Sequence, residues 1–275
     1  MAEKRKFIDV KRVISDKNPK LLKWLPGFLV RYIQKILHEE QVNDFLLLHK
    51  GDNSFEFCRA AIEYMDIHLT AAGVEHVPAS GGCILAINHP LGGMDAMAIV
   101  TQLESTRRDI KFIVNDVLLN LENLKEMFVG VNLIGKNAKD SLRKVDELFA
   151  TDQLICVFPA GLVSRKTGGV VEDLEWKKTF VTRARKHQKP IIPVHINGAL
   201  SDFFYRLARL RKAIGLKANI EMLYLVNELF KQRGVHMHVV FGKPINPGDL
   251  NNDKTDLEWA QEIKKEVYQL AKQDD

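Results

Sequence analysis

The sequence is poor in the features that mark secreted, disulfide-bonded or membrane-spanning proteins. Among 275 residues there are three cysteines, Cys58, Cys83 and Cys156, an odd number at wide spacing. This pattern argues against a disulfide framework or a zinc site and favours a reducing compartment. No apolar run approaches the ~20 residues that cross a bilayer, and the start MAEKRKFIDVKR lacks the apolar core of a secretory signal. We therefore expect a cytoplasmic protein that is soluble or peripheral on a membrane.

Internal repeats, low-complexity tracts and an interdomain linker are also absent from the sequence. The chain is long enough to bury one sizeable core. Apolar runs of strand length alternate with segments of helical period, which predicts the α/β class. We predict a single domain over residues 66–275, with a central, mostly parallel or mixed sheet flanked by helices. Residues 1–65 are predicted to form a basic N-terminal region of amphipathic helices.

Positive charge is concentrated in two places. Residues 1–37 hold ten Lys or Arg and three Asp or Glu, whereas residues 249–275 hold four basic and eight acidic residues. A second basic cluster, residues 206–217, contains no acid and follows three aromatic residues. Such clusters suit an anionic lipid surface or an acidic carrier protein. Nucleic acid is not expected, because a recognised reader motif is missing.

Residues 20–37 combine this charge with an amphipathic pattern. Apolar and aromatic residues recur every three or four positions from Trp24 to Leu37, and Pro26 with Gly27 is expected to break the first turn. A basic helix with Trp and Tyr is typical of an interfacial membrane element. Docking of the same stripe onto the rest of the domain is the alternative, and the sequence favours neither.

The chain is organised around residues 83–98, CILAINHPLGGMDAMA. The apolar run from Cys83 to Ile87 predicts a buried strand, the following residues predict a tight loop, and Met94 begins good helix material. Asn88 and His89 therefore leave the end of a buried strand, which is where open α/β sheets bind ligands.

A His and an Asp six positions apart can act together if a glycine-rich loop brings them into contact. A neutral imidazole takes the proton of a hydroxyl that attacks a carbonyl, and the carboxylate fixes the tautomer and stabilises the imidazolium. We predict these roles for His89 and Asp95, with a substrate hydroxyl as the nucleophile. The amides of Gly92 and Gly93 are candidates for binding the oxyanion. The alternative is a structural His89 and an Asp95 favoured only by the helix dipole.

Three further patterns are weaker. Residues 130–137 match the P-loop except that Asn137 replaces the Ser or Thr that binds Mg²⁺, so we expect no nucleotide. His236 and His238 share one face of a late strand, but no nearby carboxylate or Cys completes a ligand set, so we expect no metal. Residues 117–128 have helical spacing.

Four ordered blocks within residues 66–245 resemble those of the PlsC-like lysophospholipid acyltransferases, also called the glycerol-phosphate acyltransferase superfamily. NHPLGGMD (88–95) is similar to the family's Asn-His-x4-Asp motif, and GVNLIGK (130–136) to its second block. FPAGLVSR (158–165) is similar to the third block, Phe-Pro-Glu-Gly-Thr-Arg, and KPIIPV (189–194) to the Pro-rich fourth.

The resemblance implies an O-acyltransferase of membrane lipid biosynthesis. His89 would be the general base and Asp95 its orienting carboxylate. An acyl thioester on acyl carrier protein or coenzyme A would be the co-substrate, and no metal or other cofactor is implied. Residues of the first three blocks are the candidates for substrate binding: Asn88, Gly92, Gly93, Lys136, Phe158, Pro159, Gly161, Ser164 and Arg165.

Three departures from the family pattern affect the expected acceptor. His89 and Asp95 are six apart rather than five, Ala160 replaces the Glu of the third block, and Lys136 replaces an Arg. Lys cannot reproduce the bidentate grip of Arg on phosphate. The variant pattern resembles the bacterial branch of ornithine- and glycine-lipid O-acyltransferases and hemolysin-like proteins.

We therefore expect a lyso-amino-acid lipid as acceptor, on the inner face of the cell membrane. Lysophosphatidate, the acceptor of 1-acylglycerol-3-phosphate acyltransferases, is the alternative substrate. A non-catalytic module that binds membranes or carrier proteins is the alternative from another functional class.

Overall fold

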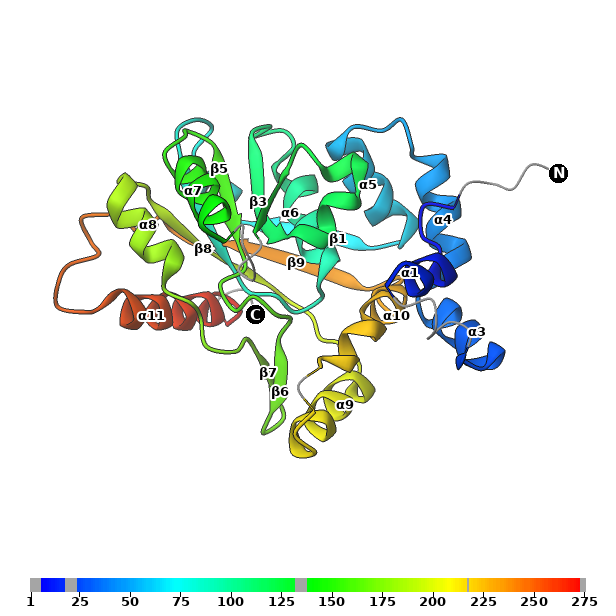
Figure 1. Cartoon of the computed structure of the whole chain (residues 1–275). Coiled ribbons are helices and arrows are strands. Elements are labelled where there is room, and N and C mark those ends of the chain that lie inside the picture. The colour runs from blue at the N-terminus through cyan, green and yellow to red at the C-terminus, as the bar shows by residue number, and fades with distance from the viewer. Residues whose placement is uncertain (1–5, 18–23, 132–137, 217, 273–275) are drawn as a thin grey trace. The chain divides into compact units, whose positions relative to one another are not determined.

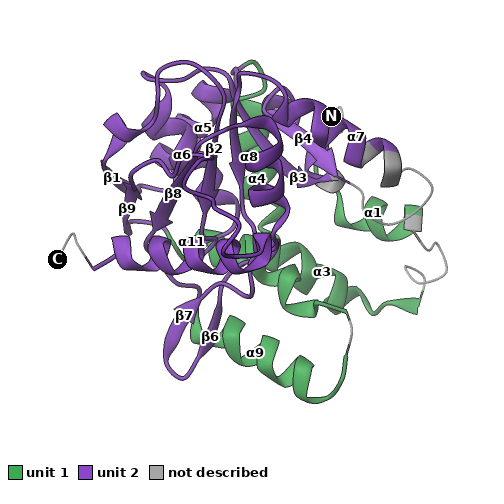
Figure 2. Ribbon diagram, turned by 90° about the vertical axis from the view of Figure 1, so that its left-hand side faces the viewer, with its two compact units in different colours: residues 1–51, 201–232 green, residues 52–200, 233–275 purple. Residues whose placement is uncertain are grey.

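A computed structural model describes residues 6–17, 24–131, 138–216 and 218–272. The chain divides into two compact units. Unit 1 comprises residues 1–51 and 201–232, and unit 2 comprises residues 52–200 and 233–275 (Figure 2). The segment 201–232, assigned above to the α/β domain, therefore groups with the N-terminal segment. The division into domains of residues 1–65 and 66–275 stays a prediction.

Unit 2 is built on a seven-stranded sheet with the order β1-β9-β8-β2-β5-β3-β4 (Figure 1). Neighbouring strands pair in parallel, except that β8 and β9 are antiparallel. The predicted α/β class with a mostly parallel, mixed sheet is confirmed. The strands are β1 (His68–Ala72), β2 (Cys83–Ile87), β3 (Ile110–Asn115), β4 (Phe128–Val131), β5 (Leu154–Val157), β8 (Ile191–Ile196) and β9 (His236–Phe241).

The central strands β2 and β5 are apolar along their whole length because both faces of the sheet are covered. Every residue of β2 is 0% exposed. On one face the strands share a hydrophobic cluster with α7 (Ala138–Phe149), α8 (Thr179–His187) and α11 (Asp256–Leu270). On the other face, α5 (Ser54–Tyr64) and α6 (Gly93–Leu103) pack against each other. A separate antiparallel hairpin joins β6 (Arg165–Thr167) and β7 (Val170–Glu172).

Capping residues set where helices begin. The side chain of Asn53 accepts the N–H groups of Phe55 and Glu56 at 2.9 and 3.1 Å, and the Glu56 carboxylate accepts the Asn53 N–H at 2.9 Å. This capping box starts α5, and Thr255 with Glu258 starts α11 in the same way.

Residues 117–128 do not form one helix despite their helical spacing. They contain two short 3₁₀ segments, η2 (Asp116–Asn120) and η3 (Glu122–Leu124). Asn123 is tied to the start of α5, since its amide donates to the Asp52 carbonyl at 2.8 Å and its carbonyl accepts the Ser54 hydroxyl at 2.6 Å. These tertiary bonds hold a turn where local spacing alone favours a helix.

Unit 1 is helical in its described part. Two distant segments meet in it, because the His38 ring stacks on Phe230 at 4.0 Å and its Nε2 lies 3.1 Å from Asn227 Oδ1. No described helix of the chain is both long and apolar enough to cross a membrane. The elements are α1 (Val10–Lys17), α3 (Gly27–Ile36), α4 (Glu39–Leu48), α9 (Asp202–Ala213), the 3₁₀ segment η4 (Ile220–Tyr224) and α10 (Leu225–Phe230).

Of the helix expected over residues 20–37, residues 20–23 lie outside the described residues, and α3 begins at Gly27. Pro26 is the N-cap of α3, so the break predicted at Pro26 and Gly27 is the helix start. Pro cannot donate a backbone hydrogen bond and is tolerated only at the beginning of a helix.

A buried histidine on β8 makes the stability of unit 2 depend on pH. His195 is 8% exposed, and burial, with a smaller contribution from His238, lowers its pKa to about 4. The ordinary value near 6.5 applies in the unfolded chain. Between these two values the unfolded state binds more protons, so stability falls as pH falls through this window.

We expect the free energy of unfolding to lose up to about 3 kcal/mol from this group between pH 6.5 and 4. Chemical denaturation of the wild type and of His195→Phe at several pH values measures it. The Phe ring keeps the edge-on contact with Tyr268. An identical pH slope in the two proteins would contradict the assignment.

Candidate active site

The predicted His and Asp are in contact at the carboxyl end of β2. Nδ1 of His89 lies 2.8 Å from Oδ2 of Asp95, close to the ideal hydrogen-bond length. The Asp95 side chain is 0% exposed and the His89 side chain 20% exposed. In the described part of the chain no hydrogen bond to Nε2 of His89 is found. The carboxylate thus fixes a tautomer in which Nδ1 carries the proton and Nε2 can accept one.

The loop absorbs the extra residue between His89 and Asp95 at one glycine. Gly92 has φ 78° and ψ −129°, a conformation that only glycine adopts without strain. This turn lets the N–H groups of Leu91 and Gly92 each donate to Oδ2 of Asp95 at 3.0 Å. The Gly92 amide is therefore engaged by Asp95, which corrects its assignment as an oxyanion donor. Gly93, exposed and first in α6, keeps that predicted role.

We expect Gly92→Ala to disrupt the contact between His89 and Asp95. An Ala at this backbone conformation costs about 1–3 kcal/mol of strain, and relief of that strain moves the donors away from Asp95. Acyl-transfer activity should fall at least tenfold. Gly93→Ala is the matched control, because Gly93 has no positive φ and open space where a Cβ would lie. Equal activities of the two variants would contradict this explanation.

Burial dominates the electrostatics of Asp95. Desolvation raises the pKa of Asp95 above its usual value, while the hydrogen bond and charge of His89 and the Leu91 N–H oppose the shift. The charge of Asp173 adds to the increase. Three N–H donors converge on this carboxylate, so the loop is built to hold an acceptor next to the imidazole.

The third sequence block meets the first because β5 is the neighbour of β2 in the sheet. The strands run parallel, so Phe158 leaves β5 at the same edge at which His89 leaves β2. The Phe158 ring stacks on the His89 ring, with centroids 4.1 Å apart and planes at 27°. This contact places Phe158 beside the imidazole and limits the ring's rotation.

Asn88 is buried, and its side-chain amide bonds to the backbone rather than facing a substrate. It is 2% exposed, its Nδ2 donates to the Ile196 carbonyl at 2.8 Å, and its Oδ1 accepts the Ile196 N–H at 2.7 Å. The amide therefore continues the pairing of β2 with β8 past the last strand residue. Because Asn88 directly precedes His89, these bonds to β8 also fix where the His89 backbone lies.

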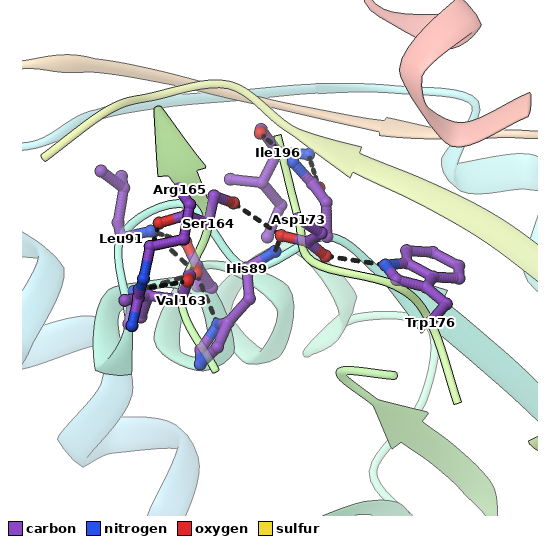
Figure 3. A network of polar contacts seen from close by, with 11 residues as sticks. His89, Leu91, Val163, Ser164, Arg165, Asp173, Trp176 and Ile196 are labelled. Carbon is purple, nitrogen blue, oxygen red and sulfur yellow. Dashed lines mark hydrogen bonds and ion pairs between the residues drawn. The ribbon is translucent and has the colours of Figure 1, made fainter. Parts of the chain in front are cut away.

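Sequence analysis missed Asp173, a buried carboxylate that joins the loops around His89. Its Oδ1 accepts the Ser164 hydroxyl at 2.6 Å and the His89 backbone N–H at 3.2 Å, and its Oδ2 accepts the Trp176 indole N–H at 2.9 Å (Figure 3). Ser164 is 1% exposed and its N–H donates to the His89 carbonyl at 2.8 Å. The only sequence signal was an Asp shortly after a Gly-Gly turn that follows the third block.

The remaining predicted residues lie in the same loop or outside the described residues. The Arg165 guanidinium donates to the Val163 carbonyl at 2.6 Å, so part of the side chain folds onto its own loop. Pro159 is buried, and its carbonyl accepts the Lys177 N–H at 3.1 Å. Gly161 has φ 70° and closes a turn onto the Phe158 carbonyl. Lys136 and most of the P-loop-like stretch 130–137 lie outside the described residues.

Neither histidine of the late strand lies in a metal-like cluster in the ranges that the structure describes. His236 stacks on His68 with ring centroids 4.7 Å apart, and His238 Nδ1 lies 2.6 Å from the Thr70 hydroxyl. Both contacts join β9 to β1 across their parallel pairing.

Comparison with known proteins agrees with this geometry. A lyso-glycine lipid O-acyltransferase of Bacteroides thetaiotaomicron is 41% identical over 96% of this chain and 97% of its own length. One from Phocaeicola vulgatus is 39% identical over 96% and 95%. The crystal structure of the 1-acyl-sn-glycerophosphate acyltransferase PlsC from Thermotoga maritima covers 95% of the chain and 93% of its own, with a TM-score of 0.53 and 18% identity, and so shares the fold. An acyltransferase family model matches residues 12–275, and the chain therefore belongs to the acyltransferase family.

Proposed function

We propose that this acyltransferase moves a fatty acyl group from a thioester to the free hydroxyl of a lyso-glycine lipid. The contact of 2.8 Å between His89 and the buried Asp95 carries the proposal, because it forms a general base without an enzyme nucleophile. The two relatives near 40% identity support the glycine-lipid acceptor. Acyl carrier protein and coenzyme A are the proposed sources of the thioester.

The chemistry needs one proton acceptor and one oxyanion donor. Nε2 of His89 takes the proton as the hydroxyl oxygen attacks the thioester carbonyl, while Asp95 stabilises the imidazolium. The tetrahedral intermediate then collapses, the C–S bond breaks, and the thiolate receives the proton from Nε2. Ester and free thiol leave. A donor such as the Gly93 amide, at the start of α6, would face the transient oxyanion.

The acceptor assignment is tested by direct competition. Purified protein receives labelled palmitoyl-acyl carrier protein or palmitoyl-coenzyme A, with lyso-glycine lipid and lysophosphatidate in equal amounts. We expect labelled glycine lipid as the main product. Labelled phosphatidate alone would establish the alternative acceptor, and no acyl transfer from either thioester would overturn the proposal.

The non-catalytic binding module loses its main support. Its motives were the longer spacing of His89 and Asp95 and the Ala160 substitution. The two side chains are nevertheless in contact, and Ala160 lies in the hydrophobic cluster, 6% exposed, where it fills space. A small apolar residue there leaves the contact between His89 and Asp95 undisturbed.

We place the enzyme at a lipid surface through unit 1. Trp24, Phe28 and Tyr32 recur every four residues and are 86%, 68% and 46% exposed. Phe28 and Tyr32, at i and i+4, share one face of α3, and Trp24 precedes its N-cap, Pro26. Exposed aromatic side chains alongside basic residues such as Arg31 and Lys35 suit the anionic interface of a bilayer.

A second exposed apolar set belongs to α9 and the residue after it. Leu210 and Ile214 are 60% and 67% exposed, and basic residues of the cluster 206–217 lie among them. The two sets are linked within unit 1, because the Tyr224 hydroxyl lies 2.9 Å from that of Tyr32 and its ring meets Phe203 edge-on at 5.0 Å. Unit 1 therefore offers both apolar anchors and positive charge.

We expect the double variant Phe28→Ser, Leu210→Ser to bind vesicles of anionic phospholipid at least tenfold more weakly than the wild type. Full burial of one such side chain contributes about 1.5–3 kcal/mol. Sedimentation with vesicles at low and high salt measures this. The control is Val170→Ser, an equally exposed apolar residue of unit 2 at 63%. Unchanged binding of the double variant would exclude this surface.

A further inference from the structure

We infer that Asp173 is a second functional carboxylate, a positioning residue that fixes His89 for proton transfer. The inference rests on the proposed function and assigns a role that neither the motif blocks nor the contact between His89 and Asp95 contains. Asp173 follows β7 and lies 84 positions after His89 in the sequence. Its carboxylate bonds the backbone N–H of His89, the Ser164 hydroxyl and the Trp176 indole N–H.

Asp173 and Ser164 together hold the backbone of His89 from both sides. The His89 N–H donates to Asp173 Oδ1 at 3.2 Å, and the His89 carbonyl accepts the Ser164 N–H at 2.8 Å. The Ser164 hydroxyl closes the triangle with a 2.6 Å bond to the same Oδ1 (Figure 3). Ring orientation depends on the backbone that carries it, so this bonding sets where Nε2 points.

The opposite end of Asp173 is fixed to the core and to α11. Oδ2 accepts the indole N–H of Trp176, which is 0% exposed. The Asp173 N–H donates to the Tyr268 hydroxyl at 2.7 Å, and the Asp173 carbonyl accepts Lys264 Nζ at 2.6 Å. Through Asp173, the His89 peptide is thereby held in a fixed position relative to α11 and Trp176.

A buried carboxylate that serves only as a structural link carries a large desolvation cost. Asp173 is 4% exposed, and the three donors to its carboxylate are a hydroxyl, an indole and a peptide N–H, all neutral. Burying a carboxylate with neutral donors alone costs more than burying an amide. Its negative charge lies beside the residue that becomes an imidazolium during the reaction, which is where such a charge lowers the barrier.

The test compares Asp173→Asn with Ser164→Ala and with the control Asp109→Asn. Asp109 forms a two-bond pair with Arg107 at the opposite, amino edge of the sheet, with both distances 2.7 Å. Its loss removes a bonded carboxylate from the same unit without touching the site. For each variant we measure kcat, both KM values, and hydrogen exchange of the His89 amide.

Asp173→Asn should lower kcat about 10- to 100-fold with KM values changed less than about threefold, as expected for an interaction used in the transition state. Its His89 amide should exchange faster. Ser164→Ala keeps the bond from Asp173 to the His89 N–H, so we expect a smaller loss of kcat. Asp109→Asn should lower stability only.

Several results would overturn the inference. Folded Asp173→Asn with kcat within twofold of the wild type is one, and KM values that rise as strongly as kcat falls are another, since that is a general structural effect. If Asp173→Asn does not fold, unchanged kcat in Ser164→Ala has the same meaning. A wild type without acyl transfer would defeat the proposed function, whereas unchanged amide exchange in the variants would defeat the inference by itself.

Discussion

Replacement of His89 by Ala should reduce acyl transfer about 10²- to 10⁴-fold, the usual contribution of a positioned general base. This corresponds to about 3–5 kcal/mol of lost transition-state stabilisation. The reason is specific to the site: Nε2 is the proton acceptor, residues 83–98 contain no Ser, and their one Cys, Cys83, is 0% exposed at the far end of β2 from His89. The measurement is the initial rate of labelled acyl transfer from acyl carrier protein to lyso-glycine lipid.

Two further variants separate lost chemistry from lost structure. Removing the imidazole leaves Asp95 buried with only backbone donors, which by itself lowers stability. His89→Asn supplies an amide N–H near the position of Nδ1 but no base, so it should fold better than Ala and remain inactive. His236→Ala, on β9 and stacked on His68, should keep full activity. Wild-type rates for either His89 variant would remove this residue from the mechanism.

Asp95→Asn should be nearly as damaging, with kcat reduced about 10³- to 10⁴-fold. An amide can accept the N–H groups of Leu91 and Gly92 at its single oxygen, so the loop should persist. The three donors meet at one oxygen, Oδ2, so the amide either places its oxygen there and gives Nδ1–H a weaker, neutral acceptor, or turns its NH₂ group toward Nδ1 and forces the wrong tautomer for a base. The negative charge that stabilises the imidazolium is lost as well.

The kinetic pattern distinguishes this effect from a general loss of folding. We expect KM for the thioester to change little, because Asp95 is 0% exposed and has no access to substrate. Asp146→Asn is the control, since Asp146 of α7 pairs with Lys186 of α8 at 2.6 Å. Substantial turnover by Asp95→Asn at its optimal pH would show that His89 does not need this partner.

Sequence patterns identified those features of the fold that repeat along the chain. The strand predicted from Cys83 to Ile87 agrees with the structure. The reason is that buried parallel strands are short, continuously apolar and bounded by Gly, Pro or polar residues. Helical spacing in residues 117–128 did not identify the turn found there. The turn is held by hydrogen bonds of Asn123 to Asp52 and Ser54, which lie about 70 positions earlier in the chain.

At the site, the motif located the reacting pair but not its surroundings. His89 and Asp95 stand in one strand-loop-helix segment, so their contact was predictable once a glycine stood between them. The Gly92 N–H donates to Asp95, and the Asn88 side chain bonds to the Ile196 backbone. Both contacts depend on where backbone atoms lie, which the residue types do not reveal.

The sequence by itself determined the sheet's central strands, the reacting pair and the family, because these depend on residues close together in the chain. Only the tertiary structure decided that Phe158 lies on the imidazole, since β5 had first to be placed beside β2. It also decided that Asp173 bonds to the His89 peptide across 84 positions. Contacts between distant segments arise from strand order and helix packing, and a single sequence carries no local pattern that records them.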